Sequence, residues 1–474
     1  MKMTVVSTAA LLLLTAGASR GASAAPPAAA AYDAAAADAR ALLAELVAAD
    51  TTNPPGNEAR VAAIGAARLK ELGIAHEVDE FAPGRANLIA RIKGDGSEKP
   101  LLLLSHSDVV GASGQPWTSD PHTLTERDGF LMGRGASDDL GMGVVAFEVM
   151  KLLQQARTPL RRDVILAWTG DEESGGEGIR WQLKHKPETI DAAVALNEGG
   201  SLIIGESGKP RLFQLQVAEK SNEDFEISVS GPTGHSSVPL PGNAIARLAR
   251  GLDKLAQHRF PARLLSATRA YFAERAKAET GRTVEAMRAI VAAYDARKEL
   301  PADAVGVIEE DIPVGLNLRT TCVITTISGG TRVNALPASA RANVNCRMLP
   351  DETAAGVRDQ LVAWLEDPGF AVKAEGKVGF ARASPVENEV PAALLKVMGE
   401  LHPGVPVIPF MGRGFTDSRS LRAHGIESYG VKPLGLTELE ERRAHGIDER
   451  IPVGSLRPAV ELYHRLVLEL AARR

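Results

Sequence analysis

Nearly continuous apolar runs alternate with amphipathic segments over the first half of the chain. Residues 87–92, 101–105, 164–169 and 192–196 resemble buried strands, and residues 58–72, 143–153 and 178–184 have helical spacing. This alternation predicts an α/β fold with a mixed, largely parallel sheet flanked by helices. Before it, an Ala-rich stretch up to about Tyr32 is expected to be mobile, and an amphipathic helix follows through Leu42 and Val47.

The pattern changes near residue 218. Residues 225–235, 320–330 and 339–348 alternate apolar with polar positions, as strands exposed on one face do, and a long charged helical stretch lies at 266–298. We expect an inserted α+β lid and dimerisation domain over residues 218–383. The catalytic domain would then consist of residues 25–217 and 384–474, closing with a helix at 456–470.

The N-terminus has the layout of a secretory signal peptide, which we place at residues 1–24. Lys2 precedes an apolar stretch from Val5 to Ala16, and small residues follow at 22–24. The stretch is short for a membrane span, which needs about 20 residues, although an uncleaved anchor is the alternative. We therefore expect a secreted or periplasmic protein that has no contact with the membrane once the signal is removed.

The remaining composition is that of an ordinary globular protein. Charged residues make up 24% of the chain and the net charge is −5, which argues against a nucleic-acid partner. The two cysteines, Cys322 and Cys346, lie in two strand-like runs joined by a Gly-rich turn. A disulfide between them and two free buried thiols both agree with this pattern.

Polar side chains follow several of the apolar strands at the point where each ends. His106 and Asp108 end one run, and Glu172, Glu173 and Glu198 follow two others. A fourth segment, LMGRGASDDLGMG, places Asp138 and Asp139 just before a helix. Because ligands bind at the carboxyl ends of strands in an open α/β sheet, these groups are expected to converge. Imidazole and carboxylate ligands favour a dinuclear zinc site.

The motifs HSD, GRGASDD, GDEESGG, LNEGG and HGIDER, in this order, resemble the di-zinc exopeptidase and aminoacylase family. This family includes carboxypeptidase G, carnosinase, succinyl-diaminopimelate desuccinylase and aminoacylase. The similarity extends over essentially the whole mature chain, and the helical insertion is similar to the carboxypeptidase S-like branch. The resemblance implies two Zn²⁺ ions per chain, for which Co²⁺ or Mn²⁺ could substitute.

The resemblance also assigns roles to individual residues. His106 and Glu198 would bind one metal, Glu173 and His445 the other, and Asp138 would bridge both. Glu172 would be the general base for a water shared by the metals, and Asp108 would orient the His106 ring. His424, in RAHGIES, competes with His445 for the last ligand position, but the GIDE that follows His445 favours His445.

The resemblance also implies residues that bind the substrate and stabilise the oxyanion, most of them in the lid domain. His235 would stabilise the oxyanion from the partner subunit of a homodimer, and Asn334 would help to hold the substrate. Arg347 would bind a free carboxylate, and the segment at Gly412 would line the pocket. The sequence departs from the family pattern at two positions: Leu140 stands where many members have Lys, and Asn197 stands where aminoacylases have Asp. Because neither position is a metal ligand, these departures affect the expected substrate preference more than the expected metal binding.

We therefore expect an exported zinc exopeptidase, of the carboxypeptidase or dipeptidase type, that cleaves an amide bond next to a free carboxylate. The alternative is an N-acyl-amino-acid hydrolase on the same site, so the substrate is a small peptide or an N-acyl amino acid. A non-catalytic metal-binding protein of the same fold is less favoured, because Glu172 and every ligand are present. A serine hydrolase is not supported, because the mature chain contains no G-x-S-x-G motif.

Overall fold

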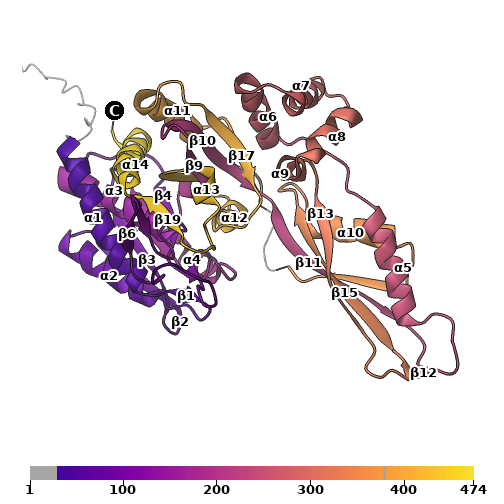
Figure 1. Ribbon diagram of the computed structural model, residues 1–474. Coiled ribbons are helices and arrows are strands. Elements are labelled where there is room, and N and C mark those ends of the chain that lie inside the picture. The colour runs from indigo at the N-terminus through magenta and orange to yellow at the C-terminus, as the bar shows by residue number, and fades with distance from the viewer. Residues whose placement is uncertain (1–28, 377–380, 474) are drawn as a thin grey trace, which may run out of the picture.

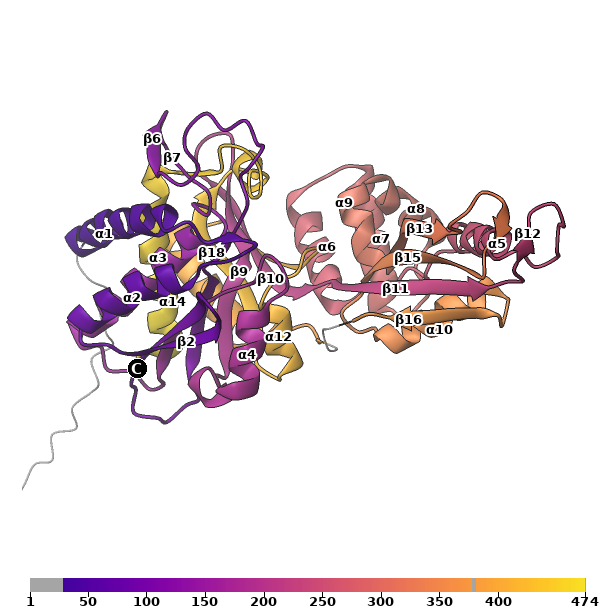
Figure 2. The ribbon, with the colours of Figure 1, turned by 90° about the horizontal axis from the view of Figure 1, so that it is seen from below.

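The computed structural model describes residues 29–376 and 381–473. The predicted signal peptide lies outside these residues. Figures 1 and 2 show two bodies joined by extended chain, a larger one with a central sheet and a narrower one that projects from it. Among the described residues, no helix combines the length and apolar character needed to cross a membrane.

The larger body is built on an eight-stranded mixed sheet with the order β17-β10-β18-β9-β4-β8-β3-β2. The strands β4, β8, β9 and β18 at its centre run parallel, which confirms the predicted fold class. The strand bounds are β2 (Ala75–Ala82), β3 (Arg85–Ile92), β4 (Leu101–His106), β8 (Val164–Thr169), β9 (Val194–Ile204), β10 (Pro210–Glu219), β17 (Val407–Gly412) and β18 (Glu427–Leu436).

Helices cover both faces of this sheet, which explains why its central strands read as continuous apolar runs. In β4, Leu101 and Leu103 face one helix layer while Leu102 and Leu104 face the other. The first layer contains α1 (Ala29–Ala48), α2 (Ala59–Glu71), α3 (Leu140–Ala156), α11 (Glu389–Leu401) and α14 (Leu456–Ala471). The second contains α4 (Glu177–His185) and α12 (Ser418–Ala423).

The N-terminal prediction needs a correction. Tyr32, expected at the end of a mobile stretch, lies within α1 and is buried. Its hydroxyl lies 3.0 Å from Nδ1 of His464 on α14, so the first and last helices pack together. Tertiary packing overrides the low sequence complexity of this Ala-rich segment.

The narrower body, called the lid here, contains a four-stranded antiparallel sheet with the order β13-β15-β11-β16. Helices α5 (Ala244–Gln257) and α10 (Ala354–Leu365) cover one face of this sheet. Its strands are β11 (Ser221–Ser230), β13 (Thr321–Gly329), β15 (Ser339–Met348) and β16 (Phe370–Ala374), and a small pair, β12 (Gly234–His235) and β14 (Ala335–Leu336), forms its tip.

The two cysteines form a disulfide across the β13–β15 pair. Cys322 and Cys346 are direct cross-strand partners in the antiparallel register, and their Cα atoms are 4.1 Å apart. Of the two arrangements that the sequence allowed, the structure therefore adopts the bridged one.

The predicted helical stretch at 266–298 is two helices, α6 (Ser266–Ala278) and α7 (Arg282–Asp295). The break lies at Gly281, whose φ of +117° favours glycine and does not fit a helix. With α8 (Ala302–Glu310) and α9 (Ile312–Gly315), these helices form a small core of their own, and α6 also packs against β17 of the large sheet.

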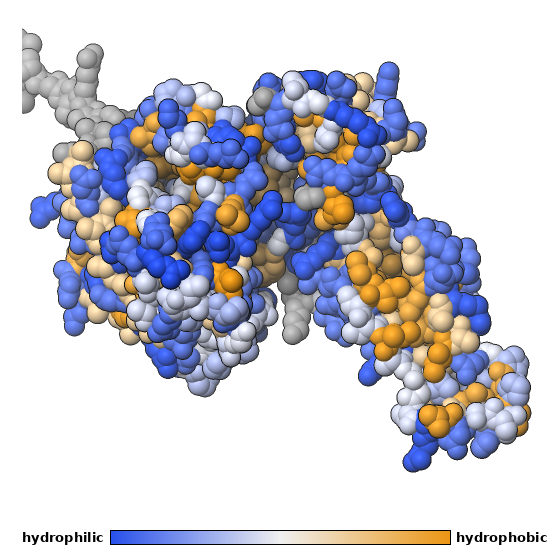
Figure 3. All heavy atoms as spheres, viewed as in Figure 1, coloured by the Kyte–Doolittle hydropathy of each residue, from blue (hydrophilic) through white to orange (hydrophobic). Residues whose placement is uncertain are grey.

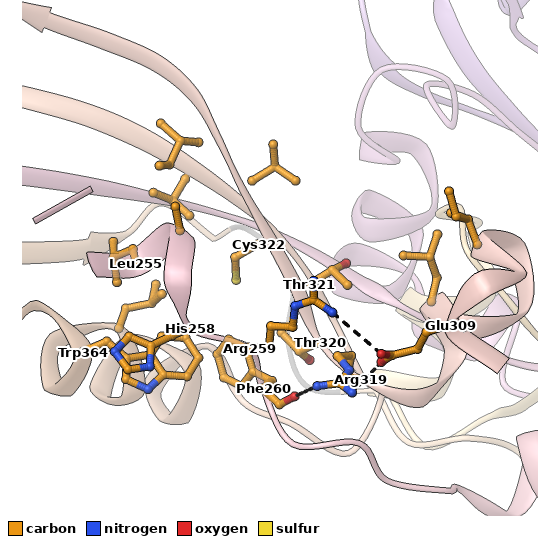
Figure 4. Close-up of a pocket in the computed structure, with 18 residues that line it drawn as sticks. Leu255, His258, Arg259, Phe260, Glu309, Arg319, Thr320, Thr321, Cys322 and Trp364 are labelled. Atoms are coloured by element: carbon orange, nitrogen blue, oxygen red, sulfur yellow. Dashed lines mark hydrogen bonds and ion pairs between the residues drawn. The ribbon is translucent and has the colours of Figure 1, made fainter. Parts of the chain in front are cut away.

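A pocket of about 480 Å³ opens in the lid beside β13, where Leu255 of α5 and Trp364 of α10 line its apolar side (Figure 4). The His258 ring stacks on Trp364 with 5.1 Å between ring centroids. At the other end, Glu309 pairs with Arg319. The shorter elements of the chain are β1 (Thr52–Asn53), β5 (Val109–Val110), β6 (Thr125–Arg127), β7 (Phe130–Met132), β19 (Arg450–Pro452), α13 (Glu438–Glu441) and three 3₁₀ turns at Pro187–Thr189, Leu316–Leu318 and Val453–Ser455.

Candidate metal centre

The carboxyl ends of β4, β8 and β9 bring several predicted site residues to one edge of the large sheet. His106 is the last residue of β4, and Glu172 and Glu173 follow β8 in a tight turn. Glu198 lies on β9 just beyond the point where that strand pairs with β4. Since the three strands are parallel neighbours, their ends meet at one place.

The ligand atoms of these residues lie close enough to share metal ions. Nε2 of His106 is 3.2 Å from Oδ1 of Asp138 and 3.9 Å from Oε1 of Glu198. Potential ligand atoms of His106, Glu172 and Glu198 fall within 4.8 Å of one another, as do those of His106, Asp138 and Glu173. Asp138 therefore occupies the middle of the cluster.

His445 completes the cluster from the C-terminal part of the chain. Its Nε2 lies 3.0 Å from Oε2 of Glu173 and 3.3 Å from Oδ2 of Asp138. The two oxygens of Asp138 thus face two different imidazoles, the arrangement that a bridging carboxylate requires. The competing residue, His424, is exposed at the end of α12.

Asp108 holds the site together differently from the expected way. Nδ1 of His106 lies 2.9 Å from the main-chain oxygen of Asp108 and 3.6 Å from its carboxylate. A carbonyl oxygen can only accept, so Nδ1 carries the hydrogen and Nε2 keeps its lone pair for a metal. The Asp108 carboxylate instead accepts from the main-chain N–H groups of Glu172 and Glu173, at 3.1 Å each, and from Asn53 at 2.8 Å.

The protonation behaviour of the cluster shows an excess of buried negative charge. Burial and the neighbouring Glu198 raise the pKa of Glu172 well above its usual range, and burial together with Asp138 does the same for Glu198. Hydrogen bonds that the His445 ring donates to the carboxylates of Asp138 and Glu173 raise the pKa of His445 to about 10. Buried carboxylates of this kind need cations beside them, and the imidazole and carboxylate donors fit divalent metal ions.

A cleft of about 980 Å³ separates the cluster from the base of the lid. Glu172 and His445 line one side of it, and Arg347 of β15 lines the side formed by the lid. Gly412 does not line this cleft, because it is buried against Gln216, whose side chain a Cβ at this position would meet at 2.4 Å. The next part of the same loop, Gly414 and Phe415, does line it.

Comparison with known proteins assigns the chain to a family. Residues 102–469 match the model of peptidase family M20/M25/M40. The chain belongs to this family. It is therefore a hydrolytic enzyme, as the motifs predicted.

Individual relatives of the M20 enzyme are distant in sequence. The N-fatty-acyl-amino acid synthase/hydrolase PM20D1.1 of Danio rerio is 26% identical over 399 residues, which cover 82% of this chain and 76% of the relative. Aminoacylase-1A of Rattus norvegicus is 25% identical over 85% of this chain and 88% of its own. The M20 family metallo-carboxypeptidase Sso-CP2 of Sulfolobus solfataricus has the same fold, with a TM-score of 0.67 and 20% identity over 91% of this chain and 99% of its own.

Two predicted residues of the M20 enzyme lie away from the cleft. His235 and Asn334 sit together at the tip of the lid, where the main-chain N–H of Ser236 donates to the Asn334 carbonyl at 3.0 Å. Both are exposed, and Figures 1 and 2 place the tip, marked by β12, at the end of the lid that points away from the large sheet. The chain therefore does not bring these two residues to its own cluster.

Sequence reasoning missed some residues that support the cluster of this M20 enzyme. Asn53 donates from its side chain to both Asp108 and Asp171, and nothing in the loop TTNPPGNE indicates this role. Lys432 lies in β18 and is buried near the cluster, where Glu441, Asp138 and Glu198 raise its pKa against the opposing effect of burial. A lysine inside the otherwise apolar run SYGVKP was the available signal.

Proposed function

We propose that this chain is an exported zinc exopeptidase that cleaves the amide bond next to a free carboxylate in a small peptide. The observation that carries the proposal is the position of Arg347 across the cleft from the six clustered side chains. A guanidinium matches a carboxylate with two parallel hydrogen bonds. It would hold the substrate terminus while the amide bond lies over the cluster.

The distances within the cluster support the ligand roles that the resemblance implies. His106 and Glu198 would hold one metal, Glu173 and His445 the other, and Asp138 would bind both. When bound, two divalent ions supply Lewis-acid polarisation of the scissile carbonyl and lower the pKa of a water between them. Zinc is our proposal for both, because the donor set combines imidazole and carboxylate groups.

Glu172 would move the proton of the reaction. Its carboxylate is buried, points into the cluster, and has one oxygen, Oε1, without a hydrogen-bond partner among the described residues. It is therefore free to take a proton from the attacking water and to pass it to the leaving amine. The main-chain N–H of Glu172 is held by Asp108, which keeps the carboxylate in place.

The lining of the cleft supports a peptide over a long-chain acyl substrate. Phe415 is its one large apolar side chain among the described residues, and the rest of the lining is charged, polar or glycine. Long acyl chains are bound by extended apolar surface. The alternative function, hydrolysis of N-acyl amino acids, uses the same cluster and is favoured by the aminoacylase and N-fatty-acyl-amino acid relatives.

We also propose that the active form is a homodimer in which His235 and Asn334 reach the cleft of the partner subunit. The outer edge of β13 supports this arrangement, because it exposes Val323 and Ile327 at 63% and 60%. An exposed apolar edge strand is a template for pairing with another chain. Figure 3 shows apolar side chains gathered along the lid, and the pocket of Figure 4 opens at the same strand.

Export is proposed from the signal-like residues 1–24, and the Cys322–Cys346 disulfide supports it. Structural disulfides persist in oxidising compartments such as the periplasm and the extracellular space. N-terminal sequencing of the protein recovered from outside the cytoplasm would test this, and a chain that begins at Ala25 is the expected result.

One assay tests the proposed reaction. Mature protein is stripped with a chelator, reloaded with zinc, and given matched dipeptides and N-acyl amino acids that share the same C-terminal residue. We expect zinc-dependent release of that residue, with faster release from dipeptides. Faster release from the N-acyl series would favour the alternative, and no release from a protein with two bound metals would contradict the hydrolase itself.

A further inference from the structure

Two buried charged residues, Arg134 and Glu449, join the loops that carry Asp138 and His445. Nη1 of Arg134 lies 2.7 Å from Oε2 of Glu449, and each side chain is 1% exposed. Neither belongs to the cluster itself. An ion pair taken so completely out of water is retained only where many further hydrogen bonds compensate its desolvation.

The Glu449 carboxylate is bound on several sides by the loop that leads to Asp138. It accepts from the main-chain N–H groups of Ser137 and Asp138 at 2.9 Å each and from that of Gly135 at 3.2 Å. These three donors are directed at one carboxylate, so its position determines the path of the loop. Asp138 is itself one of the three donors, so its main chain is held directly by Glu449.

Arg134 binds the other loop. Its Nη2 donates to the main-chain oxygen of Gly446 at 3.1 Å and lies 3.4 Å from that of His445. Nη2 also donates to the Gln115 side chain, which in turn donates to the His445 carbonyl at 3.1 Å. The guanidinium packs 4.9 Å from the centre of the Trp117 ring.

The backbone of His445 needs such support. Its φ is +64°, in the left-handed region that residues with a side chain rarely adopt. Conformations of this kind persist only where the surroundings over-determine them. The contacts from Arg134 and Gln115 to the His445 carbonyl supply that constraint.

We propose that Arg134 and Glu449 form a positioning clasp that sets the spacing between Asp138 and His445, and thereby the affinity for the second metal ion. The 3.3 Å between His445 Nε2 and Asp138 Oδ2 is the distance that the clasp controls. The first metal would be held by His106 and Glu198 at the β4 and β9 strand ends and would share Asp138, so the clasp should affect it less than the second. The inference rests on the proposed metal centre.

The test measures zinc stoichiometry and the two dissociation constants by chelator competition in the full-length mature protein. For Glu449→Gln and Arg134→Lys we expect the second zinc to bind about 10- to 100-fold more weakly, the usual effect of removing a group that orients a ligand. The first zinc should weaken less than the second, because only the shared Asp138 links it to the clasp. Gln115→Ala removes one bond to the His445 carbonyl and should give a smaller shift in the same direction.

A matched control separates positioning from general stability. Arg162 and Glu389 form another ion pair in the same domain, in which Arg162 is buried and Glu389 half-buried, with Nη1–Oε1 at 3.0 Å. Glu389→Gln should lower the thermal midpoint of the apoprotein and leave both zinc affinities unchanged. Should a clasp variant fail to fold, Gln115→Ala still reports on the His445 side.

Two results would overturn the clasp, and a third has another meaning. Wild-type affinity for both metals in all three variants would show that the pair has a purely structural role. Equal weakening of both metals would contradict control of one site. If wild type binds no zinc, the proposed metal centre fails, and with it the basis of the clasp.

Discussion

The strand ends of the large sheet and the tip of the lid carry groups proposed for the same reaction, but the chain holds them in opposite ways. His106 and Asp108 are buried, and fixed main-chain partners orient both. His235 is exposed, and its ring contacts Ser237, two residues along the chain. One half of the site is therefore built by folding, while the other half stays on a surface where a second copy can use it.

The largest expected effect is on catalysis, when the proposed general base in the buried half of the site is replaced. Glu172→Gln should lower kcat about 10²- to 10⁴-fold, because the side chain loses its ability to accept a proton. Zinc content and the thermal midpoint should stay near wild type, since Asp108 holds the main chain at this position. Glu177→Gln, on the cleft rim, is the matched control and should keep most activity. Full activity in Glu172→Gln would reject the proposed base.

The next prediction tests the exposed half. His235→Ala should lower kcat about 10²- to 10³-fold, the usual loss when one oxyanion donor is removed. Mixing it with Glu172→Gln should restore up to about a quarter of wild-type activity, since half of the dimers are mixed and each then has one intact site. An absence of recovery despite demonstrated subunit exchange would contradict donation by the partner.

A third prediction concerns stability and separates the two bodies. Replacing Cys322 and Cys346 by Ala removes a link between residues 24 positions apart, which should cost the lid about 3 kcal/mol of unfolding free energy. In urea unfolding followed by tryptophan fluorescence, the transition of the lid, to which Trp364 contributes, should move to lower urea. Zinc affinity of the large body should not change, and a loss of zinc binding would show that the two bodies are coupled.

The last prediction concerns pH, and its effect is small within any one pH unit. Burial lowers the pKa of His464 from 6.5 to about 4, so the folded chain binds this proton less readily than the unfolded chain. The large body should keep full stability above pH 6.5 and lose up to about 1.4 kcal/mol per pH unit as the pH falls toward 4.

Two variants check this interpretation by urea unfolding between pH 4 and 7. His464→Gln should flatten the dependence. Tyr32→Phe removes the hydroxyl that contacts the ring but keeps the burial, so it should retain the slope. An unchanged slope in His464→Gln would assign the pH dependence to other groups.

Much of the fold was predictable because the central strands are buried on both faces and contain almost no polar residue until they end. The same feature indicated the candidate cluster, since His106, Glu172 and Glu198 interrupt such runs. The break between α6 and α7 was harder to predict, because Gly281 divides a segment whose composition is otherwise typical of one helix. The proposed role of Glu449 was not predictable, because three of its partners are main-chain N–H groups that any sequence would offer, and its ion-pair partner Arg134 lies 315 residues away in the chain.

The order of strands in the large sheet has a consequence for how the protein is made. The lid sheet comes from one continuous stretch of chain, whereas β18, a late strand, lies between β9 and β10 of the large sheet. A growing chain can thus complete the lid sheet before the large sheet, which must wait for residues beyond 427 and finally for α14 to pack on α1. The cluster also closes late, when His445 arrives, so a chain that ends before His445 has a lid sheet but only part of the candidate metal centre.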